Sequence, residues 1–201
     1  YPLELERSID VAGAAVRLRP VGPVDERLMR DLLYSRSEGI YYPRLGKPVA
    51  RLEREAVQQL CTADYDRQMS IGAFAGAAGG DAMVGVGRYD VDRSTQMAEI
   101  VVLVREDHQG KGIAGGLLEQ LTKAAEARGI LGFHARARET DVQLIGFLQK
   151  RCSPVQVEVE GGLVHLTWLF EEVRRLRESR REKTIRRERG GTGRLDGPVR
   201  Q

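Results

Sequence analysis

The segment from residue 105 to residue 118 carries the pattern that most directly predicts a chemical function. The aliphatic run at 100–104 predicts a strand buried on both faces, and a glycine-bearing turn at 109–114 leads from it into an amphipathic helix. Small residues at the start of a helix let unpaired backbone N–H groups approach a ligand, and the helix dipole favours negative charge there. The segment therefore predicts a pyrophosphate site, although the same glycines would also suit a turn that only begins a helix.

The remaining pattern predicts the elements that must position this turn. We expect strands at 3–9, 14–19, 69–75, 82–89, 96–104, 130–137, 155–159 and 163–169, helices at 25–35, 50–63, 113–128 and 141–150, and a loop at 38–48. The Gly-rich link at 76–81 resembles a phosphate loop in composition. No helix is predicted after it, so a hairpin turn is favoured there.

The turn Gln109-Gly110-Lys111-Gly112-Ile113-Ala114 matches the Q/R-x-x-G-x-G/A signature of the GNAT superfamily of acetyl-CoA-dependent N-acyltransferases. It stands between a Val-rich strand and a helix, as that family requires, and the resemblance extends over most of residues 1–170. The segments 1–6, 18–20, 64–69 and 98–100 resemble one branch in particular. That branch comprises bacterial protein-lysine acetyltransferases, which are often fused to or act on acyl-CoA synthetases.

The resemblance implies a fold, a cofactor and a set of binding residues. The fold would be the α/β (α+β) GNAT fold, a mixed and mostly antiparallel sheet of about seven strands flanked by about four helices. The co-substrate would be acetyl-CoA, with the pyrophosphate on the turn and the pantetheine along the strand before it. The implied cofactor-binding residues are Val102, Leu103, Val104, Gln109, Gly110, Lys111, Gly112, Ile113 and Ala114.

The resemblance also implies a general base. An acceptor lysine has an unperturbed pKa of about 10.4, so a carboxylate beside the thioester is needed to take its proton. Glu99 falls in the Ala-Glu segment where the branch carries its proposed base, on the central strand and five residues before Val104. The alternative for Glu99 is a solvated or ion-paired strand residue. Asp64 and Asp66 are secondary candidates for the base, although capping the second helix suits them better.

Two positions depart from the wider family. Many GNAT enzymes carry an Asn after the fifth main strand and a Tyr seven residues later as general acid, and here Thr140 and Phe147 stand at these positions. The lysine acetyltransferase branch commonly lacks that Tyr, so water or another group would protonate the departing thiolate. Cys152 is interpreted as a small core residue rather than a nucleophile.

Charge and composition bound the remaining possibilities. The formal net charge is +3, but residues 171–201 hold eleven Lys or Arg and six Asp or Glu, so residues 1–170 are nearly neutral. A basic helical-to-disordered tail at 171–201 is predicted, and its lack of aromatic residues argues against a nucleic-acid arm. No apolar run is long enough to span a membrane. Three scattered histidines offer no metal spacing, and two cysteines suit a reducing, cytoplasmic setting.

The sequence leaves the acceptor open. The leading hypothesis is a cytoplasmic acetyltransferase acting on a protein lysine, with an acyl-CoA synthetase as a candidate partner. The alternatives are a small-molecule amine N-acetyltransferase and a non-catalytic CoA-sensing module. The chain begins at Tyr1 rather than Met, which suggests an excised piece of a longer protein.

Overall fold

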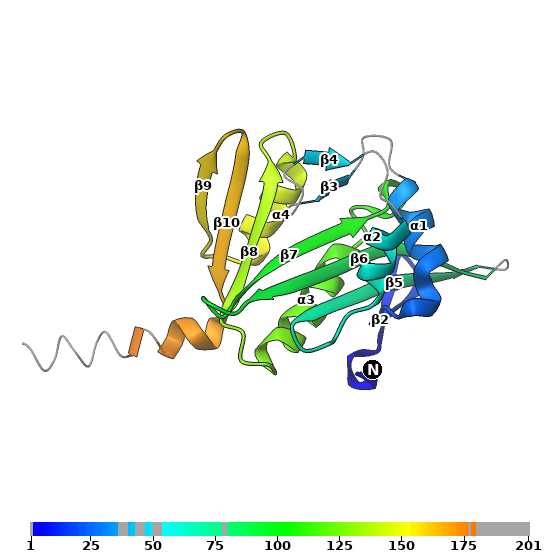
Figure 1. The fold of residues 1–201 in the computed structure, drawn as a ribbon, viewed down its shortest axis with the longest axis horizontal. Helices are drawn as coiled ribbons and strands as arrows, with labels where there is room; N and C mark the ends of the chain where they lie inside the picture. The colour runs from blue at the N-terminus through cyan, green and yellow to red at the C-terminus, as the bar shows by residue number, and fades with distance from the viewer. Residues whose placement is uncertain are drawn as a thin grey trace, which may run out of the picture. The chain divides into compact units, whose positions relative to one another are not determined.

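The computed structural model describes residues 2–35, 40–42, 47–49, 54–77, 80–176 and 178–179 (Figure 1). The chain divides into two compact units, Tyr1–Trp168 and Leu169–Gln201. In the second unit, residues 171–176 are helical, and Glu171 and Arg175 form an i,i+4 ion pair there. The boundary predicted at residue 170 stays a prediction. The part of the predicted tail beyond residue 179 lies outside the described residues.

Eight strands form one mixed sheet in the order β1-β2-β5-β6-β7-β8-β10-β9. The β7–β8 pair is parallel, whereas the registers of β1–β2, β2–β5, β5–β6, β6–β7 and β9–β10 are antiparallel. The mixed, mostly antiparallel sheet is confirmed, with one strand more than the seven expected. The bounds are β1 Arg7–Val11, β2 Ala14–Pro20, β5 Gln68–Ala77, β6 Gly80–Asp92, β7 Met97–Val104, β8 Gly132–Arg138, β9 Gln156–Glu160 and β10 Leu163–Leu169.

Helices α1 (Glu26–Tyr34) and α2 (Arg54–Cys61) share an apolar core with one face of β5, β6 and β7. Helix α3 (Ile113–Glu126) covers the opposite face of the sheet. Neighbouring residues of a strand point to opposite faces, and in β6 Val86 packs against the α1–α2 core whereas Gly87 lies against α3. The predicted apolar face of α3 is confirmed, since each of its members is buried: Ile113, Leu117, Leu118, Leu121 and Ala125.

Glycines in β6 allow α3 to lie close to the sheet. A Cβ at Gly87 would lie 2.6 Å from Leu121 Cδ1, and one at Gly85 would lie 3.1 Å from the carbonyl oxygen of Leu103. Side chains here would push α3 and its preceding turn away from the sheet. These small residues therefore help to set the height of the turn above the strands.

An ion pair beside the sheet fixes the start of α1. Asp25 occupies the N-cap position of α1, and its carboxylate accepts hydrogen bonds from the Gly22 N–H (2.9 Å) and from Arg19 (2.7 and 2.8 Å). Burial opposes the charge, yet the Arg19 and Gly22 hydrogen bonds hold the pKa of Asp25 below its usual range. Arg19 also stacks 3.8 Å above the Phe74 ring, so the entry to α1 is anchored to the sheet.

Two sequence predictions about local structure need correction. Leu3–Leu5 is a 3₁₀ helix rather than strand, and β1 begins only at Arg7. Part of the predicted loop at 38–48 is a two-stranded ladder between β3 (Ile40–Tyr42) and β4 (Lys47–Val49). The Ile and Tyr residues of β3 favour strand structure. The proline of β4 is tolerated because both strands of a two-stranded ribbon are edge strands, where a missing N–H donor costs no ladder hydrogen bond.

The other predicted elements are present with shifted ends. The Gly-rich link joins β5 to β6 as a hairpin in which Ala77 pairs with Gly80, so the phosphate-loop reading is excluded and the hairpin turn is confirmed. The helix expected at 141–150 is α4 (Val142–Arg151). Residues 50–53 of the second predicted helix lie outside the described residues.

Candidate active site

The parallel strands β7 and β8 form a fork that opens the centre of the sheet. They pair only through Met97–Gly132, Ala98–Phe133 and Glu99–His134. Beyond these pairs β7 continues to Val104 and β8 to Arg138, and Figure 1 shows the two strands diverging. The edge of β7 that faces β8 therefore carries backbone N–H and C=O groups without a strand partner, which a ligand can use.

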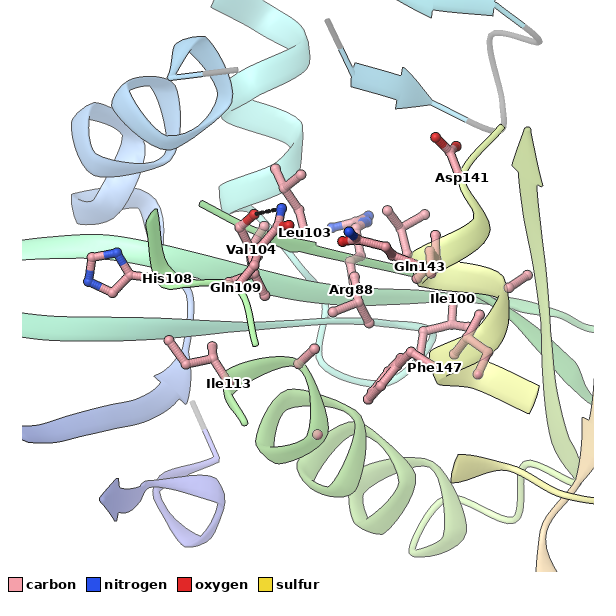
Figure 2. Close-up of a pocket in the computed structure, with 18 of the residues that line it drawn as sticks. Arg88, Ile100, Leu103, Val104, His108, Gln109, Ile113, Asp141, Gln143 and Phe147 are labelled. Carbon is pink, nitrogen blue, oxygen red and sulfur yellow. Dashed lines mark hydrogen bonds between the residues drawn. The ribbon is translucent and has the colours of Figure 1, made fainter. Parts of the chain in front are cut away.

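A cavity of about 690 Å³ occupies this fork (Figure 2). Its walls come from β7, from the turn and first residues of α3, from the end of β8 and the start of α4, and from α1, α2, β5 and β6. Figure 2 shows Leu103 and Val104 on one side of the cavity and Gln143 and Phe147 of α4 opposite them. The lining draws on both faces of the sheet, with the start of α3 on one face and residues of the α1–α2 core on the other.

The turn before α3 has the geometry of an anion cradle. A short 3₁₀ helix at Glu106–His108 precedes it, and Gly110 and Gly112 adopt left-handed conformations with φ of 71° and 88°. A Cβ at either glycine would meet no atom within 4 Å, so conformation rather than crowding requires glycine here. The first N–H groups of α3 have no intrahelical acceptor, and its first turn holds no acidic residue. A pyrophosphate could accept hydrogen bonds from these N–H groups, and its negative charge suits the positive end of the helix dipole.

Eight of the nine predicted cofactor-binding residues line the cavity: Val102, Leu103, Val104, Gln109, Gly110, Gly112, Ile113 and Ala114. Lys111 is the exception, because its ammonium group is directed to the Asp107 carbonyl oxygen at 2.8 Å on the exposed side of the turn. The Gln109 amide donates to the Val104 carbonyl oxygen at 3.2 Å, as the dashed line in Figure 2 marks, and so ties the turn to the end of β7.

A small charged cluster braces the turn from outside. Both carboxylate oxygens of Asp107 accept from Arg105, at 2.7 and 2.9 Å, and Oδ1 also lies 2.7 Å from His108 Nδ1. The Arg105 and His108 contacts hold the pKa of Asp107 far below its usual range. The cluster keeps Asp107 ionised and engaged, and it leaves the imidazole of His108 on the cavity wall.

The opposite end of the cavity is mainly apolar. Its lining there includes Met29 and Leu33 of α1, Leu60 of α2, and Val86 and Leu103 of the sheet. The sequence places Met29, Leu33 and Leu60 on predicted helices but gives no sign that they border a cavity. Only the packing of α1 and α2 over β6 and β7 brings them together.

One charged residue, Arg88 of β6, lies among these apolar residues. It donates to Asp90 through Nε (3.0 Å) and Nη2 (3.1 Å), and to Ser70 Oγ through Nη1 (3.0 Å). Ser70 in turn donates to the Leu60 carbonyl oxygen at 3.1 Å, which ties β5 and β6 to α2. Nothing in the sequence singled out Arg88, because a single arginine beside the glycines of β6 does not reveal contacts with Ser70 and Asp90.

Glu99 lies at the point where the fork opens, outside the cavity lining. Arg136 Nε donates a hydrogen bond to Glu99 Oε1 at 2.8 Å, Arg136 Nη2 makes an ion-pair contact with the same oxygen at 2.7 Å, and Arg136 itself lines the cavity. His134, its register partner on β8, is half-buried. Burial lowers the pKa of that imidazole, and the Glu99 charge partly opposes the shift. Glu99 therefore lies at the last β7–β8 pair, next to the cavity but not among the residues that line it.

The start of α4 and the residues just before it line the side of the cavity that faces β7. Thr140 and Phe147, which replace the Asn and Tyr of the wider family, both line the cavity. Arg138 donates to Asp141 at 3.0 Å, and both residues line the cavity beside Gln143. A phenyl ring therefore stands where a phenol would act, so residue 147 has no hydroxyl to give a thiolate its proton.

Three other candidates from the sequence lie away from the cavity lining. Asp64 Oδ1 accepts from the backbone N–H groups of residues 66, 67 and 68 at 2.8–3.0 Å, which is a turn-forming role. Asp66 is exposed and also lies outside the lining. Burial raises the pKa of Cys152 to about 11, so its thiol is a poor nucleophile at neutral pH.

Comparisons with known proteins agree on the fold. The model of the acetyltransferase (GNAT) family matches residues 35–153. The crystal structure of the GNAT domain of Streptomyces lividans PAT has a TM-score of 0.73 and 25% identity, covering 85% of this chain and 99% of that one. PaiA N-acetyltransferase from Thermoplasma acidophilum, solved with coenzyme A, has a TM-score of 0.61 at 16% identity, covering 77% and 99%.

A longer relative is also similar. A mutant of a cAMP-binding acyltransferase from Mycobacterium smegmatis has a TM-score of 0.57 and 25% identity, over 84% of this chain. The match spans about half of that protein, 48% of its length. In the part of this chain that the structure describes, no helix is long and apolar enough to cross a membrane. The same residues contain no group of three or more His, Cys, Asp and Glu placed to hold a metal ion.

Proposed function

The chain belongs to the GNAT acetyltransferase family, and from this premise we propose that it transfers an acetyl group from acetyl-CoA directly to a lysine amine of a protein. The observation that carries the proposal is the shape of the cavity. It joins the anion cradle at the start of α3 to an apolar end beneath α1 and α2, and it passes the free edge of β7 on the way.

The cradle and the fork suit the donor. We assign the pyrophosphate to the backbone of the turn from Gln109 to Ala114, and the pantetheine to the edge of β7 at Val102, Leu103 and Val104. Acetyl-CoA supplies an activated acyl group, and its thioester carbonyl gains negative charge when an amine attacks. A backbone N–H of β7 directed at that oxygen would stabilise the charge without any covalent enzyme intermediate.

The apolar end suits a lysine side chain. A lysine presents a four-carbon stem before its amine, and Met29, Leu33 and Leu60 would contact such a stem along the cavity wall. The similarity to the S. lividans PAT domain, at 25% identity, supports the GNAT assignment, and the lysine acceptor rests on the resemblance of the sequence to the lysine acetyltransferase branch. An acyl-CoA synthetase is our first candidate for the partner. Two free cysteines, Cys61 and Cys152, agree with action in the cytoplasm.

We assign the proton transfer to Glu99. The amine must lose a proton during the attack, and a carboxylate at the base of the fork can take it directly or through one water. The hydrogen bond and the ion-pair contact of Arg136 both fall on Oε1, and the described residues donate no hydrogen bond to Oε2, which leaves that oxygen for the proton. Since residue 147 is Phe, we expect water to protonate the departing thiolate.

The acceptor class can be tested with an amine panel read by mass spectrometry. The chain would be incubated with acetyl-CoA and, separately, lysine peptides blocked at the N-terminus, an acyl-CoA synthetase, a polyamine and an aminoglycoside. Matched peptides with Arg in place of Lys are the controls. We expect acetylation of lysine peptides or of the synthetase. Transfer to the small amines alone would replace the proposal with a small-amine enzyme, and CoA binding without any transfer would indicate a sensing module.

A further inference from the structure

Arg136 occupies a particular place in the fork. Glu99 and His134 form the last pair of the β7–β8 ladder, and Arg136 stands two residues farther along β8, where the two strands no longer pair. Side chains two residues apart on a strand point to the same face. Arg136 therefore reaches back across the opening of the fork to Glu99, with two N–H groups on Oε1 at 2.7 and 2.8 Å.

The contact is partly shielded from water and constrains the carboxylate. The Glu99 side chain is 15% exposed and that of Arg136 is 31% exposed. One charge-assisted hydrogen bond from Nε and the ion-pair contact of Nη2, both to the same oxygen, restrict the rotation of the carboxylate and hold its negative charge in place. Because the guanidinium takes Oε1 from the β8 side, its position determines the direction in which Oε2 faces.

The surrounding charges make this contact necessary. Asp90 of β6 is the register partner of Glu99, so two carboxylates stand side by side on one face of the sheet. Like charges at neighbouring cross-strand positions destabilise each other. Each has its own arginine, Arg88 on Asp90 and Arg136 on Glu99. His134 faces Glu99 from β8, and its lowered pKa makes it a poor substitute for a permanent cation.

We propose that Arg136 is a positioning residue for catalysis, which holds Glu99 so that Oε2 faces the acceptor amine. The proposal rests on the function proposed above and adds a residue to it. Arg136 has no proton to exchange at neutral pH, because a guanidinium stays protonated, so it acts only through Glu99. Its loss should therefore slow turnover and leave the donor site nearly unchanged.

The test compares Arg136→Gln with Arg136→Lys and with Arg7→Gln, using acetyl-CoA and the lysine peptide that the panel identifies. Arg7 is the control, because it also pairs with a glutamate, Glu119 at 2.7 Å, but lies outside the cavity lining. Arg136→Gln should lower kcat about 10- to 100-fold, from the loss of the charge-assisted contacts with Glu99, while KM for acetyl-CoA changes by less than about threefold. Arg136→Lys should restore part of kcat, because it keeps the charge and loses the planar guanidinium.

A double variant separates positioning from general loss of structure. In a Glu99→Gln background, Arg136→Gln should slow turnover little further, because the group that it positions is already gone. Melting curves show whether each variant folds. If Arg136→Gln does not fold, Arg136→Lys tests the proposal in its place. Full additivity of the two changes, or an equal kcat loss in Arg7→Gln, would overturn the inference. Wild-type turnover in Glu99→Gln alone would instead overturn the base assignment, and the inference with it.

Discussion

At one end of the cavity the groups that face a ligand are mainly backbone N–H groups, and at the other end they are side chains from separate elements. The turn and the first residues of α3 form the donor end within a single stretch of sequence. The acceptor end needs α1, α2, β5, β6 and β7 together. A backbone site depends on conformation and tolerates many side chains, whereas a side-chain site changes with each substitution. The donor should therefore be the fixed property of this protein and the acceptor the variable one.

The largest effect should come from the junction between the two ends. Glu99→Gln keeps the size of the side chain and removes the base, so turnover at neutral pH should fall by about 10²- to 10⁴-fold. Acetyl-CoA affinity should hardly change, since the base lies outside the donor end. The measurement is steady-state kinetics with the best lysine peptide, together with CoA titration. Raising the pH should recover part of the rate, because more of the amine is then neutral, and a pH-independent defect would argue against a base.

The acceptor end should depend on its buried ion pair for stability. The side chains of Arg88 and Asp90 are 10% and 15% exposed, so Arg88→Met would leave a carboxylate in the protein interior without its cation. Loss of one partner of a buried pair costs about 3–5 kcal/mol of unfolding free energy. Urea denaturation measures that cost.

Arg88→Met combined with Asp90→Asn should regain much of the stability, because no charge is then stranded. If the single variant is as stable as the wild type, the network does not hold the acceptor end together. Among the described residues the donor end has no buried ion pair, because Asp107 beside the turn is 62% exposed. CoA affinity should therefore survive in whatever fraction of the variant folds.

The smallest effect should follow from removing residues 178–201. The sequence of the predicted basic tail lacks apolar periodicity beyond Leu176, so it offers no apolar face for packing. Differential scanning calorimetry and CoA titration of the truncated chain should give a melting temperature and an affinity close to those of the full chain. A fall in melting temperature of more than about 4 °C, which corresponds to roughly 1–2 kcal/mol for a protein of this size, would show that the tail packs on the domain.

The donor end could be predicted from sequence because its information is local. A buried strand, a glycine turn and an amphipathic helix follow one another between residues 97 and 126, and the structure gives β7, the turn and α3 in that order. Lys111 is the one predicted cofactor-binding residue that does not line the cavity. Motif position does not reveal that its side chain turns outward to the Asp107 carbonyl oxygen.

The acceptor end could not be predicted because its contacts are distant in the chain. Arg136 and Glu99 are 37 residues apart, and Arg88 and Ser70 are 18 apart, so no periodicity connects them. The resemblance placed Glu99 on the correct strand but could not reveal its arginine partner. The β3–β4 ladder was missed for a related reason, since a proline in a short segment outweighed the tyrosines in the sequence-based reading.

The central claim is that the N-terminus of α3 holds the pyrophosphate of CoA, and Gly112 and Gly129 allow a matched test of it. Gly112 caps the N-terminus of α3 with φ of 88°, and Gly129 lies just beyond its C-terminus with φ of 71°. At both positions an added Cβ would meet no atom within 4 Å. Glutamate at either site therefore brings similar backbone strain and the same charge, and only the distance to the predicted pyrophosphate differs.

The deciding measurement is calorimetric titration of CoA into the wild type, Gly112→Glu and Gly129→Glu, with melting curves to confirm folding. The account predicts that Gly112→Glu binds about 100-fold more weakly, because a carboxylate then faces the pyrophosphate at short range. Gly129→Glu should bind CoA within about threefold of the wild type. Equal affinity in the two folded variants would contradict the account and remove the turn from the binding site.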